Sequence, residues 1–414
     1  MIYFILLTLC LIVLVSYVFD ISSKYSKIPG VILLMTLGLA LRYITSYYEL
    51  KIPDLSILLP IMGTLGLILI VLEGSLDLKI SEDKKSLIIK SFASAVILFG
   101  LFIILFSALL YYQFNFPLKI SLLNSIPFAI ISSAVAIPSS SQLRNNDREF
   151  IVYESSVSDI IGILFFDFVL FNQLSIGTGL LIFSFEVIAT IIFSIFISLG
   201  LAYMLHKIGH HVKYVIILTS VILTFVLAKL IHWPSLIVVL IFGLIMNNNQ
   251  FFQTKYIKKW IDFQEFNQTL KSFKQITGEL TFIVRSFFFL IFGFYTSIKD
   301  LMNLQNLIMS AFICFSIFLL RGLFFKIILH KPLVPLFYFA PRGLITILLF
   351  LSIPVDLKLP FLSEGLITQT IFITILVMTL GNIFSKRHIR DLSGNIDSLS
   401  PTVTTIQLNG NETK

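Results

Sequence analysis

The feature that most restricts the fold of this chain is its succession of apolar stretches, each about as long as a membrane-spanning helix. Such a helix needs about 20 mostly apolar residues to cross ~30 Å of hydrocarbon. Charged residues make up only 13% of the sequence, against about 25% in soluble domains, which excludes an ordinary soluble enzyme. We predict an all-α polytopic membrane protein with thirteen transmembrane helices, at residues 2–19, 28–46, 55–78, 85–113, 120–143, 150–173, 177–206, 212–231, 234–248, 278–297, 303–329, 331–353 and 364–386.

The spacing of these spans predicts an internal symmetry. Spans that lie seven apart would correspond, and an odd offset reverses the direction in which they cross the membrane. Inverted repeats would then cover about residues 1–173 and 212–386, with a linker helix at 177–206. We expect one membrane domain over residues 1–390, followed by a short disordered tail at 391–414 that is rich in Ser and Thr.

The Lys and Arg residues of the short connections predict the orientation. With the N-terminus outside, 20 of them fall in cytoplasmic loops and 6 on the opposite side. We therefore expect a protein of the cytoplasmic membrane with its C-terminus in the cytoplasm. The net charge of +8 reflects this topology, so no nucleic-acid partner is needed to explain it. The polar connection at 247–274 is expected to lie as an interfacial helix against the headgroups of the lipid bilayer.

Several charged residues fall inside predicted spans, where a charge costs several kcal/mol unless it is paired or hydrated. Opposite signs within one bundle predict buried ion pairs. For any single residue, a structural pair explains its presence as well as a functional site does. These residues are Arg285, Arg321, Arg342, Glu73, Glu154, Asp159, Asp167 and, less deeply, Glu186.

The span at 150–173 carries the most polar residues. Asp159 lies ~14 Å along the helix from Phe150, close to the bilayer midplane. A carboxylate at that depth is protonated, paired or bound to a cation. Ser155 lies four residues earlier on nearly the same face, where its hydroxyl oxygen is a candidate cation ligand. A hydroxyl bonded to its own helix backbone is the commoner alternative.

Two spans carry signals of interrupted helices. Residues 124–141 combine small polar side chains with Pro127 and Pro138, and residues 339–343 contain a Pro-Arg-Gly sequence around Arg342. Broken helices near the midplane are typical of transporters, because their free carbonyls and helix ends can face an ion. A single proline kink, however, is also common in ordinary membrane helices.

These motifs resemble those of the sodium/proton exchangers, specifically the NhaP-type monovalent cation:proton antiporters. The family has a Glu-Ser-x-x-Asn-Asp signature, which Glu154, Ser155 and Asp159 match, with Ser158 in place of the asparagine. The run at 72–78, which contains Glu73, resembles the end of the family's third helix, and residues 341–344 resemble its Arg-Gly signature. Arg321 lies one predicted span before the Arg-Gly signature, at a place where the family also has an arginine.

The resemblance implies a fold with two crossed broken helices and an exchange of Na⁺, or alternatively Li⁺ or K⁺, for protons. It makes Asp159 the carrier of either ion, so that competition couples them, and it pairs Glu154 with Arg342. The candidate oxygen ligands of the transported Na⁺ are Ser132, Ser133, Ser155 and Ser158. Arg285 has no acceptor that the sequence identifies, and Asp167 is expected to line an outward vestibule. We expect a homodimer by analogy with members of the family, and we expect no cofactor.

One motif departs from the family pattern. The first broken helix usually carries Thr-Asp-Pro, and this chain has Ser132, Ser133 and Ala134 there. The missing acid leaves the choice of cation open.

Two other classes of protein compete with an antiporter. A cation channel or a K⁺ efflux system would use the same buried acid for selectivity, without coupling to protons. An intramembrane enzyme would need a catalytic partner for a buried serine or acid. The six histidines, at 206, 210, 211, 232, 330 and 388, all fall at predicted loops or helix ends, which argues against an enzyme.

Overall fold

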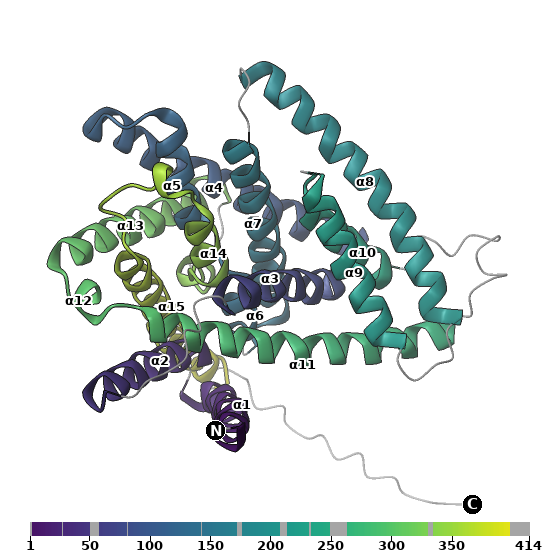
Figure 1. Cartoon of the computed structure of the whole chain (residues 1–414), viewed down its shortest axis with the longest axis horizontal. Coiled ribbons are helices and arrows are strands. Elements are labelled where there is room, and N and C mark those ends of the chain that lie inside the picture. Colours follow the sequence, from purple (N-terminus) through teal and green to yellow (C-terminus); the bar gives the residue numbers. More distant parts are fainter. Residues whose placement is uncertain are drawn as a thin grey trace, which may run out of the picture.

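The computed structural model describes residues 2–26, 28–49, 58–80, 82–141, 143–171, 176–207, 213–231, 233–248, 263–329 and 334–397 of the chain. Within these ranges every regular element is a helix (Figure 1). The longer helices are α1 (Ile2–Ser26), α2 (Gly30–Tyr47), α3 (Leu58–Asp77), α4 (Lys85–Phe114), α5 (Leu118–Ala129), α6 (Ser133–Ser139), α7 (Asn145–Phe171), α8 (Ile176–Lys207), α9 (Lys213–Leu230), α10 (Ser235–Asn247), α11 (Phe263–Tyr295), α13 (Leu304–Leu323), α14 (Leu344–Ser352) and α15 (Glu364–Asp397). The shorter elements include the helix α12 (Ile298–Leu301) and the single turn η5 (Leu336–Tyr338).

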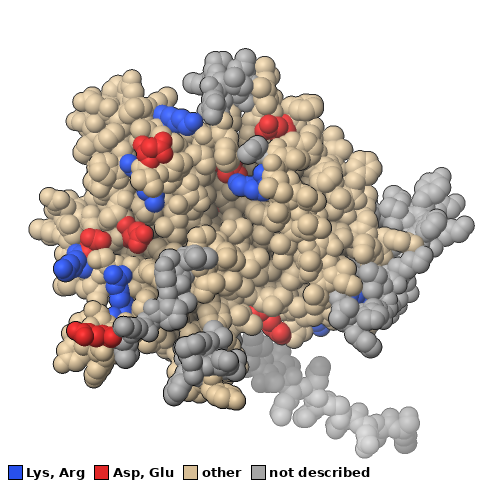
Figure 2. All heavy atoms as spheres, in the orientation of Figure 1, with Lys and Arg blue, Asp and Glu red and all other residues tan. Residues whose placement is uncertain are grey.

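The predicted all-helical membrane architecture is confirmed. In the described part of the chain, nine segments are long and apolar enough to cross a membrane, one of them being the consecutive helices α5 and α6. Two shorter apolar segments, in α1 and α10, coincide with further predicted spans. The remaining predicted spans correspond to α7, which carries many polar residues, and to α14 with the segment that precedes it. Most of the face seen in Figure 2 is accordingly free of charged side chains.

Two predicted boundaries differ from the structure. The last part of the 247–274 connection is not a separate interfacial helix, because α11 already begins at Phe263. Phe266, Leu270 and Phe273 are buried there, so this part of α11 packs against the protein. Residues 249–262 lie outside the described residues. The predicted tail also differs, because α15 continues to Asp397, and the rest of that tail is not described.

The helices form two groups in Figure 1. One group contains α4, α5, α6 and α7, which pack against one another, together with α13, α14 and α15. The other contains α3, α8, α9 and α10, and α11 runs beside it in contact with α2 and α3. Glycines permit the closest of these approaches. A Cβ atom on Gly38 of α2 would lie 2.2 Å from the Leu290 carbonyl oxygen of α11. A Cβ atom on Gly293 of α11 would lie 2.3 Å from the Met35 carbonyl oxygen of α2, so only glycine allows these two helices to pack this closely.

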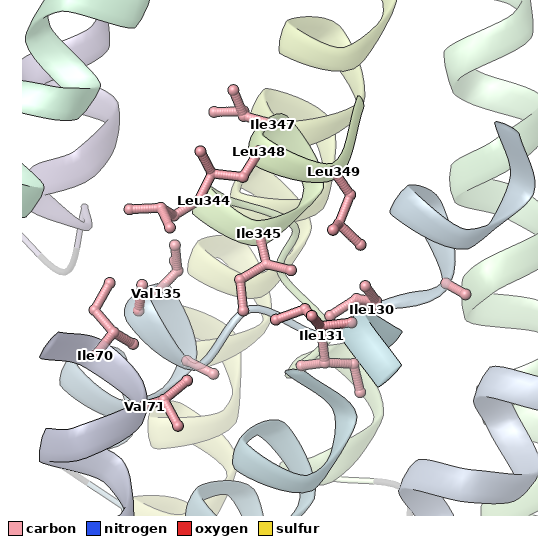
Figure 3. Close-up of a cluster of buried hydrophobic side chains, with 14 of the residues drawn as sticks. Ile70, Val71, Ile130, Ile131, Val135, Leu344, Ile345, Ile347, Leu348 and Leu349 are labelled. Carbon is pink, nitrogen blue, oxygen red and sulfur yellow. The ribbon is translucent and has the colours of Figure 1, made fainter. Parts of the chain in front are cut away.

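The two predicted helix breaks lie side by side. Residues 130–132 are not helical between α5 and α6, and residues 339–343 are not helical before α14. The Ser132 amide donates a hydrogen bond of 2.9 Å to the Pro341 carbonyl, which joins the two unwound segments. Buried aliphatic side chains surround this crossing, among them Ile130, Ile131 and Ile345 (Figure 3). An apolar surround of this kind keeps lipid and bulk water from the exposed backbone groups, as an unwound segment at membrane depth requires.

Candidate functional site

The centre of the candidate site is Asp159 in the middle of α7, with only 1% of its surface exposed. Its Oδ2 atom accepts a hydrogen bond of 3.2 Å from the amide of Ser133, the first residue of α6. Its Oδ1 atom is buried and has no hydrogen-bond partner. The break between α5 and α6 thus brings a backbone amide to one carboxylate oxygen and leaves the other oxygen free.

The structure places three of the four predicted serine ligands at the helix crossing. Ser132 lies in the first unwound segment, and its hydroxyl oxygen is buried without a hydrogen-bond partner. Ser133 contacts Asp159 through its amide. Ser158 accepts a hydrogen bond of 3.0 Å from the Ile131 amide. Two unpartnered oxygens, on Asp159 and Ser132, therefore belong to groups that flank the same break.

The Ser155 hydroxyl bonds to the backbone of its own helix, which is the alternative that the sequence left open. Its hydroxyl donates a 2.7 Å hydrogen bond to the Ile151 carbonyl of its own helix. A hydroxyl has one proton and two lone pairs, so this bond uses the donor and leaves acceptor capacity on the oxygen. Ser155 is accordingly available as a ligand only through those lone pairs.

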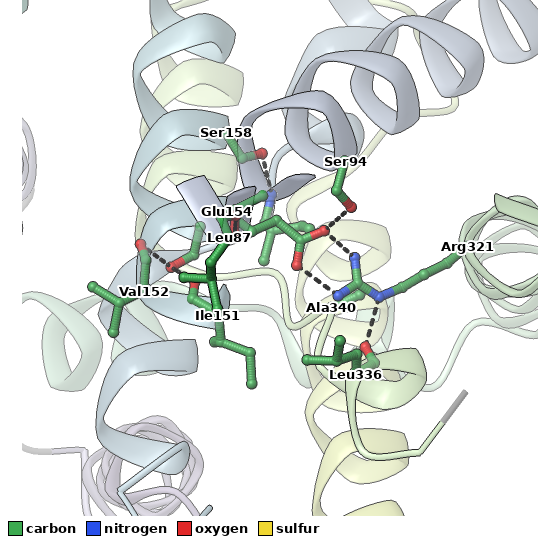
Figure 4. A network of polar contacts seen from close by, with 12 residues as sticks. Leu87, Ser94, Ile151, Val152, Glu154, Ser158, Arg321, Leu336 and Ala340 are labelled. Atoms are coloured by element: carbon green, nitrogen blue, oxygen red, sulfur yellow. Dashed lines mark hydrogen bonds and ion pairs between the residues drawn. The ribbon is translucent and has the colours of Figure 1, made fainter. Parts of the chain in front are cut away.

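Glu154 forms a buried ion pair with Arg321 of α13 (Figure 4). The two carboxylate oxygens accept bonds of 2.8 Å and 2.7 Å from the two terminal guanidinium nitrogens, and the Ser94 hydroxyl donates to the same carboxylate. The Arg321 Nε donates to the Leu336 carbonyl at 2.9 Å. Both charged side chains are 1% exposed, so this bidentate pair joins α7 to α13 with its hydrogen-bonding groups satisfied.

The predicted pairing of Glu154 with Arg342 is therefore wrong. Arg342 is 2% exposed and donates to three backbone carbonyls, those of Phe128 at 2.7 Å, Ala340 at 2.9 Å and Ala129 at 3.4 Å. The last carbonyls of a helix have no partner within that helix and carry partial negative charge. Arg342 satisfies them at the end of α5, and so it binds the two broken segments together instead of pairing with an acid.

The remaining intramembrane charges contact groups other than Asp159. Arg285 of α11 donates a 3.2 Å hydrogen bond to the Ala134 carbonyl, an acceptor that no sequence pattern identifies. Asp167 forms an ion pair of 3.0 Å with Lys229. Glu73 lies near the end of α3, partly buried, beside Gly278 of α11.

Sequence reasoning missed two polar residues of this region. The Thr346 hydroxyl, in the first turn of α14, is buried and has no hydrogen-bond partner. Asn124 of α5 donates 2.8 Å to the Leu357 carbonyl and accepts 3.3 Å from the Leu359 amide, which ties α5 to the loop after α14. The only available signal was a polar residue within an apolar stretch, and many hydroxyls in the described helices bond to their own backbone, as those of Ser91, Ser125 and Thr277 do.

The chemistry of the site follows from its few ionisable groups. In the residues that the structure describes, no three His, Cys, Asp or Glu side chains gather as a metal site would require. Around the crossing, Glu154 already forms an ion pair with Arg321. Asp159 is therefore the acid there that is available to bind an ion. One carboxylate with neutral oxygens beside it suits a monovalent cation or a proton better than a divalent cation.

Comparison with known proteins identifies the family and the fold of this chain. A family model described as "Sodium/hydrogen exchanger, transmembrane" matches residues 10–386. Two structures of the sodium proton antiporter MjNhaP1 from Methanocaldococcus jannaschii have a similar fold. The structure at pH 8 has a TM-score of 0.68 and 20% identity over 92% of this chain and 96% of that chain. An electron-microscopy structure has a TM-score of 0.67 and 19% identity over 97% and 99%.

The two kinds of similarity carry different weight. At about 20% identity the structures establish the fold alone. No curated protein sequence matches the chain. The family model, in contrast, covers most of the sequence and both broken helices. This multi-pass membrane protein therefore belongs to the sodium/hydrogen exchanger family, whose members are cation/proton antiporters and not enzymes.

Proposed function

We propose that this antiporter exchanges Na⁺ for protons by competition at a single carboxylate, that of Asp159. The observation that carries the proposal is the unpartnered Oδ1 atom of a fully buried acid beside a helix break. A buried carboxylate without a cationic neighbour in hydrogen-bond contact is costly when ionised. It therefore holds either a proton or a cation, and each ion displaces the other.

The ligands of the cation would be neutral oxygens close to Asp159. The free hydroxyl of Ser132 is the strongest candidate, because its oxygen is buried and makes no other hydrogen bond. Ser133, Ser155 and Ser158 supply further lone pairs, and the unwound segments supply backbone carbonyls. Oxygen ligands of this type suit hard cations such as Na⁺.

The positive charge of Arg342 gives the unwound segments a fixed partner. Because it binds carbonyls from both broken helices, it holds the crossing together whichever ion Asp159 carries. The Glu154–Arg321 pair likewise fixes α7 against α13. In this proposal neither arginine changes its charge during exchange, and Asp159 alone titrates.

The organisation around the site is also part of the proposal. Inverted repeats over about residues 1–173 and 212–386 would place the two broken helices in corresponding positions. The distribution of Lys and Arg supports an N-terminus outside the cytoplasmic membrane. We expect a homodimer by analogy with the family.

The experiment is reconstitution into liposomes that contain a pH-sensitive dye, with Na⁺, Li⁺ and K⁺ added in turn. The wild type should move protons in response to Na⁺. Asp159→Asn should lose this response by at least about 100-fold, because the amide keeps the volume but cannot alternate between proton and cation. Asp167→Asn is the matched control, since it removes an acid of the same helix that is paired with Lys229. Exchange at the wild-type rate in Asp159→Asn contradicts the proposal. Cation flux without proton movement indicates a channel instead.

A further inference from the structure

A small cavity lies between α4, α13 and the two unwound segments. It has a volume of about 20 Å³, and all but one of the described residues that line it are buried. Its walls are formed by apolar side chains, except for those of Arg321 and Arg342. Asp159 is not among the described residues of these walls, so the cavity is distinct from the candidate ion site.

The two arginines carry more donors than the described part of the chain has acceptors for. A guanidinium group has five N–H groups. That of Arg321 donates three hydrogen bonds, two to Glu154 and one to a backbone carbonyl. That of Arg342 also donates three, all to backbone carbonyls, and the bond to Ala129 in the cavity wall is long at 3.4 Å. Four N–H groups, on side chains that are 1% and 2% exposed, therefore still need an acceptor.

The charges beside the cavity do not balance either. Glu154 neutralises Arg321, with which it forms the buried ion pair. The guanidinium of Arg342 contacts carbonyls alone among the described residues, and a helix end supplies only about half an elementary charge. A buried charge without a full counter-charge is costly. The cavity therefore lies next to an excess of positive charge, which favours an anion.

The size of the cavity and the chemistry of its walls restrict the ligand further. A volume of about 20 Å³ is enough for one particle the size of a water molecule, which needs about 10–15 Å³. A water molecule also has two protons that need acceptors, and the side chains of the walls offer none. A chloride ion is of similar size, accepts hydrogen bonds from several N–H groups and donates none. Sulfate and phosphate ions are too large.

We propose that this cavity binds one chloride ion between the guanidinium groups of Arg321 and Arg342. The ion accepts hydrogen bonds from the remaining N–H groups of both arginines and balances the charge of Arg342. It thereby extends the Glu154–Arg321 pair to the second broken segment, so that α7, α13 and the crossing are held together by one network. The ion is a resident part of the structure and is not transported, so the proposal does not depend on the proposed function.

Bromide, which gives anomalous X-ray scattering, tests binding directly in crystals grown with bromide in place of chloride. The wild type should show one peak between Arg321 and Arg342. Ile317→Phe should show none, because the larger side chain fills the cavity while both arginines remain. Leu319→Phe is the matched control, at an exposed position of the same helix, and should keep the peak. A water molecule at this position in the wild type, or no density there, overturns the proposal.

The melting temperature in detergent tests binding in solution, with chloride replacing gluconate at constant ionic strength. The wild type should melt about 2–4 °C higher as chloride rises from about 1 to about 100 mM, because a ligand that binds only the folded protein stabilises it. Bromide should act like chloride, and sulfate should not. Leu319→Phe should keep this dependence and Ile317→Phe should lose it.

A wild type whose melting temperature does not depend on chloride contradicts the proposal. An equal dependence in the wild type and Ile317→Phe also contradicts it, because the anion then acts elsewhere. If Ile317→Phe does not fold, the bromide peak of the wild type still decides. Neither measurement involves transport, so both remain valid for a protein that does not exchange Na⁺ for protons.

Discussion

Glu154 and Asp159 are two buried acids on one helix, five residues apart, in opposite electrostatic situations. Glu154 accepts two bonds from Arg321 and a third from Ser94, so its carboxylate is fully partnered. Asp159 has one amide partner and one free oxygen. Both side chains are equally buried. Burial alone therefore does not distinguish the two acids, and the free oxygen of Asp159 is what supports our proposal that this acid carries the ion.

The largest expected effect is the loss of stability when the ion pair of Glu154 is removed. Arg321→Gln should destabilise the protein by about 3–5 kcal/mol, because it leaves Glu154 buried and charged without its cation. Glu154→Gln should also destabilise, and the double variant should lose less than the sum of the two single changes. Melting curves in detergent measure all three.

The control for this cycle is Asp159→Asn, which should lower the melting temperature little, because Asp159 has no ion pair to lose. Additive losses in the two single variants and the double variant would show that Glu154 and Arg321 are not coupled. A large loss of stability in Asp159→Asn would remove the contrast between the two acids.

A smaller effect should come from the neutral oxygen beside Asp159. Ser132→Ala should weaken the apparent affinity for Na⁺ by about five- to tenfold, since it removes one of the unpartnered oxygens, worth about 1–1.5 kcal/mol. Initial rates of exchange over a range of Na⁺ concentrations measure this. Ser139→Ala is the comparison, because its hydroxyl bonds to its own helix outside the crossing. An unchanged affinity in Ser132→Ala would exclude this hydroxyl as a ligand.

The smallest expected effect is that of membrane potential on exchange. If Asp159 alone titrates, one positive charge crosses in each direction, and the potential has no net charge to act on. An unbalanced charge would instead gain or lose ~2.3 kcal/mol per 100 mV. Na⁺-driven proton flux should therefore be equal in liposomes held at zero and at a negative potential with K⁺ and valinomycin. A strong dependence on potential would mean that a second group carries charge, and Glu73 would be the first to test.

Much of the fold could be predicted from the sequence, because hydropathy depends on composition over about 20 residues. The polar beginning of α11 could not be found in this way. Phe266, Leu270 and Phe273 recur every three to four residues, which indicates a helix, but not that it continues into the span. Both helix breaks fall within the predicted stretches at 124–141 and 339–343, although Pro127 and Pro138 lie inside α5 and α6 and not at the first break.

The partners of the buried charges were harder to predict. The choice between Arg321 and Arg342 for Glu154 depends on how α13 and the second broken helix are oriented around α7, which no sequence spacing defines. Arg342 and Arg285 both bind backbone carbonyls. Every residue has a carbonyl, so an acceptor of this kind leaves no trace in the sequence. The serines at the crossing were predicted from the resemblance to the family, because Ser132 and Ser133 occupy the place of its Thr-Asp-Pro motif and Ser158 that of its asparagine.

The central claim is that a proton and a cation compete for Asp159, and proton release on cation binding tests it most directly. Na⁺ is added to the purified protein in weakly buffered detergent solution with a pH dye, at a series of pH values. The wild type should release up to about one proton per chain, in the pH range where Asp159 is protonated before Na⁺ is added. More Na⁺ should be needed as the pH falls, and Asp159→Asn should release none. Undiminished release from Asp159→Asn, or Na⁺ binding to the wild type without release at any pH, would contradict the account.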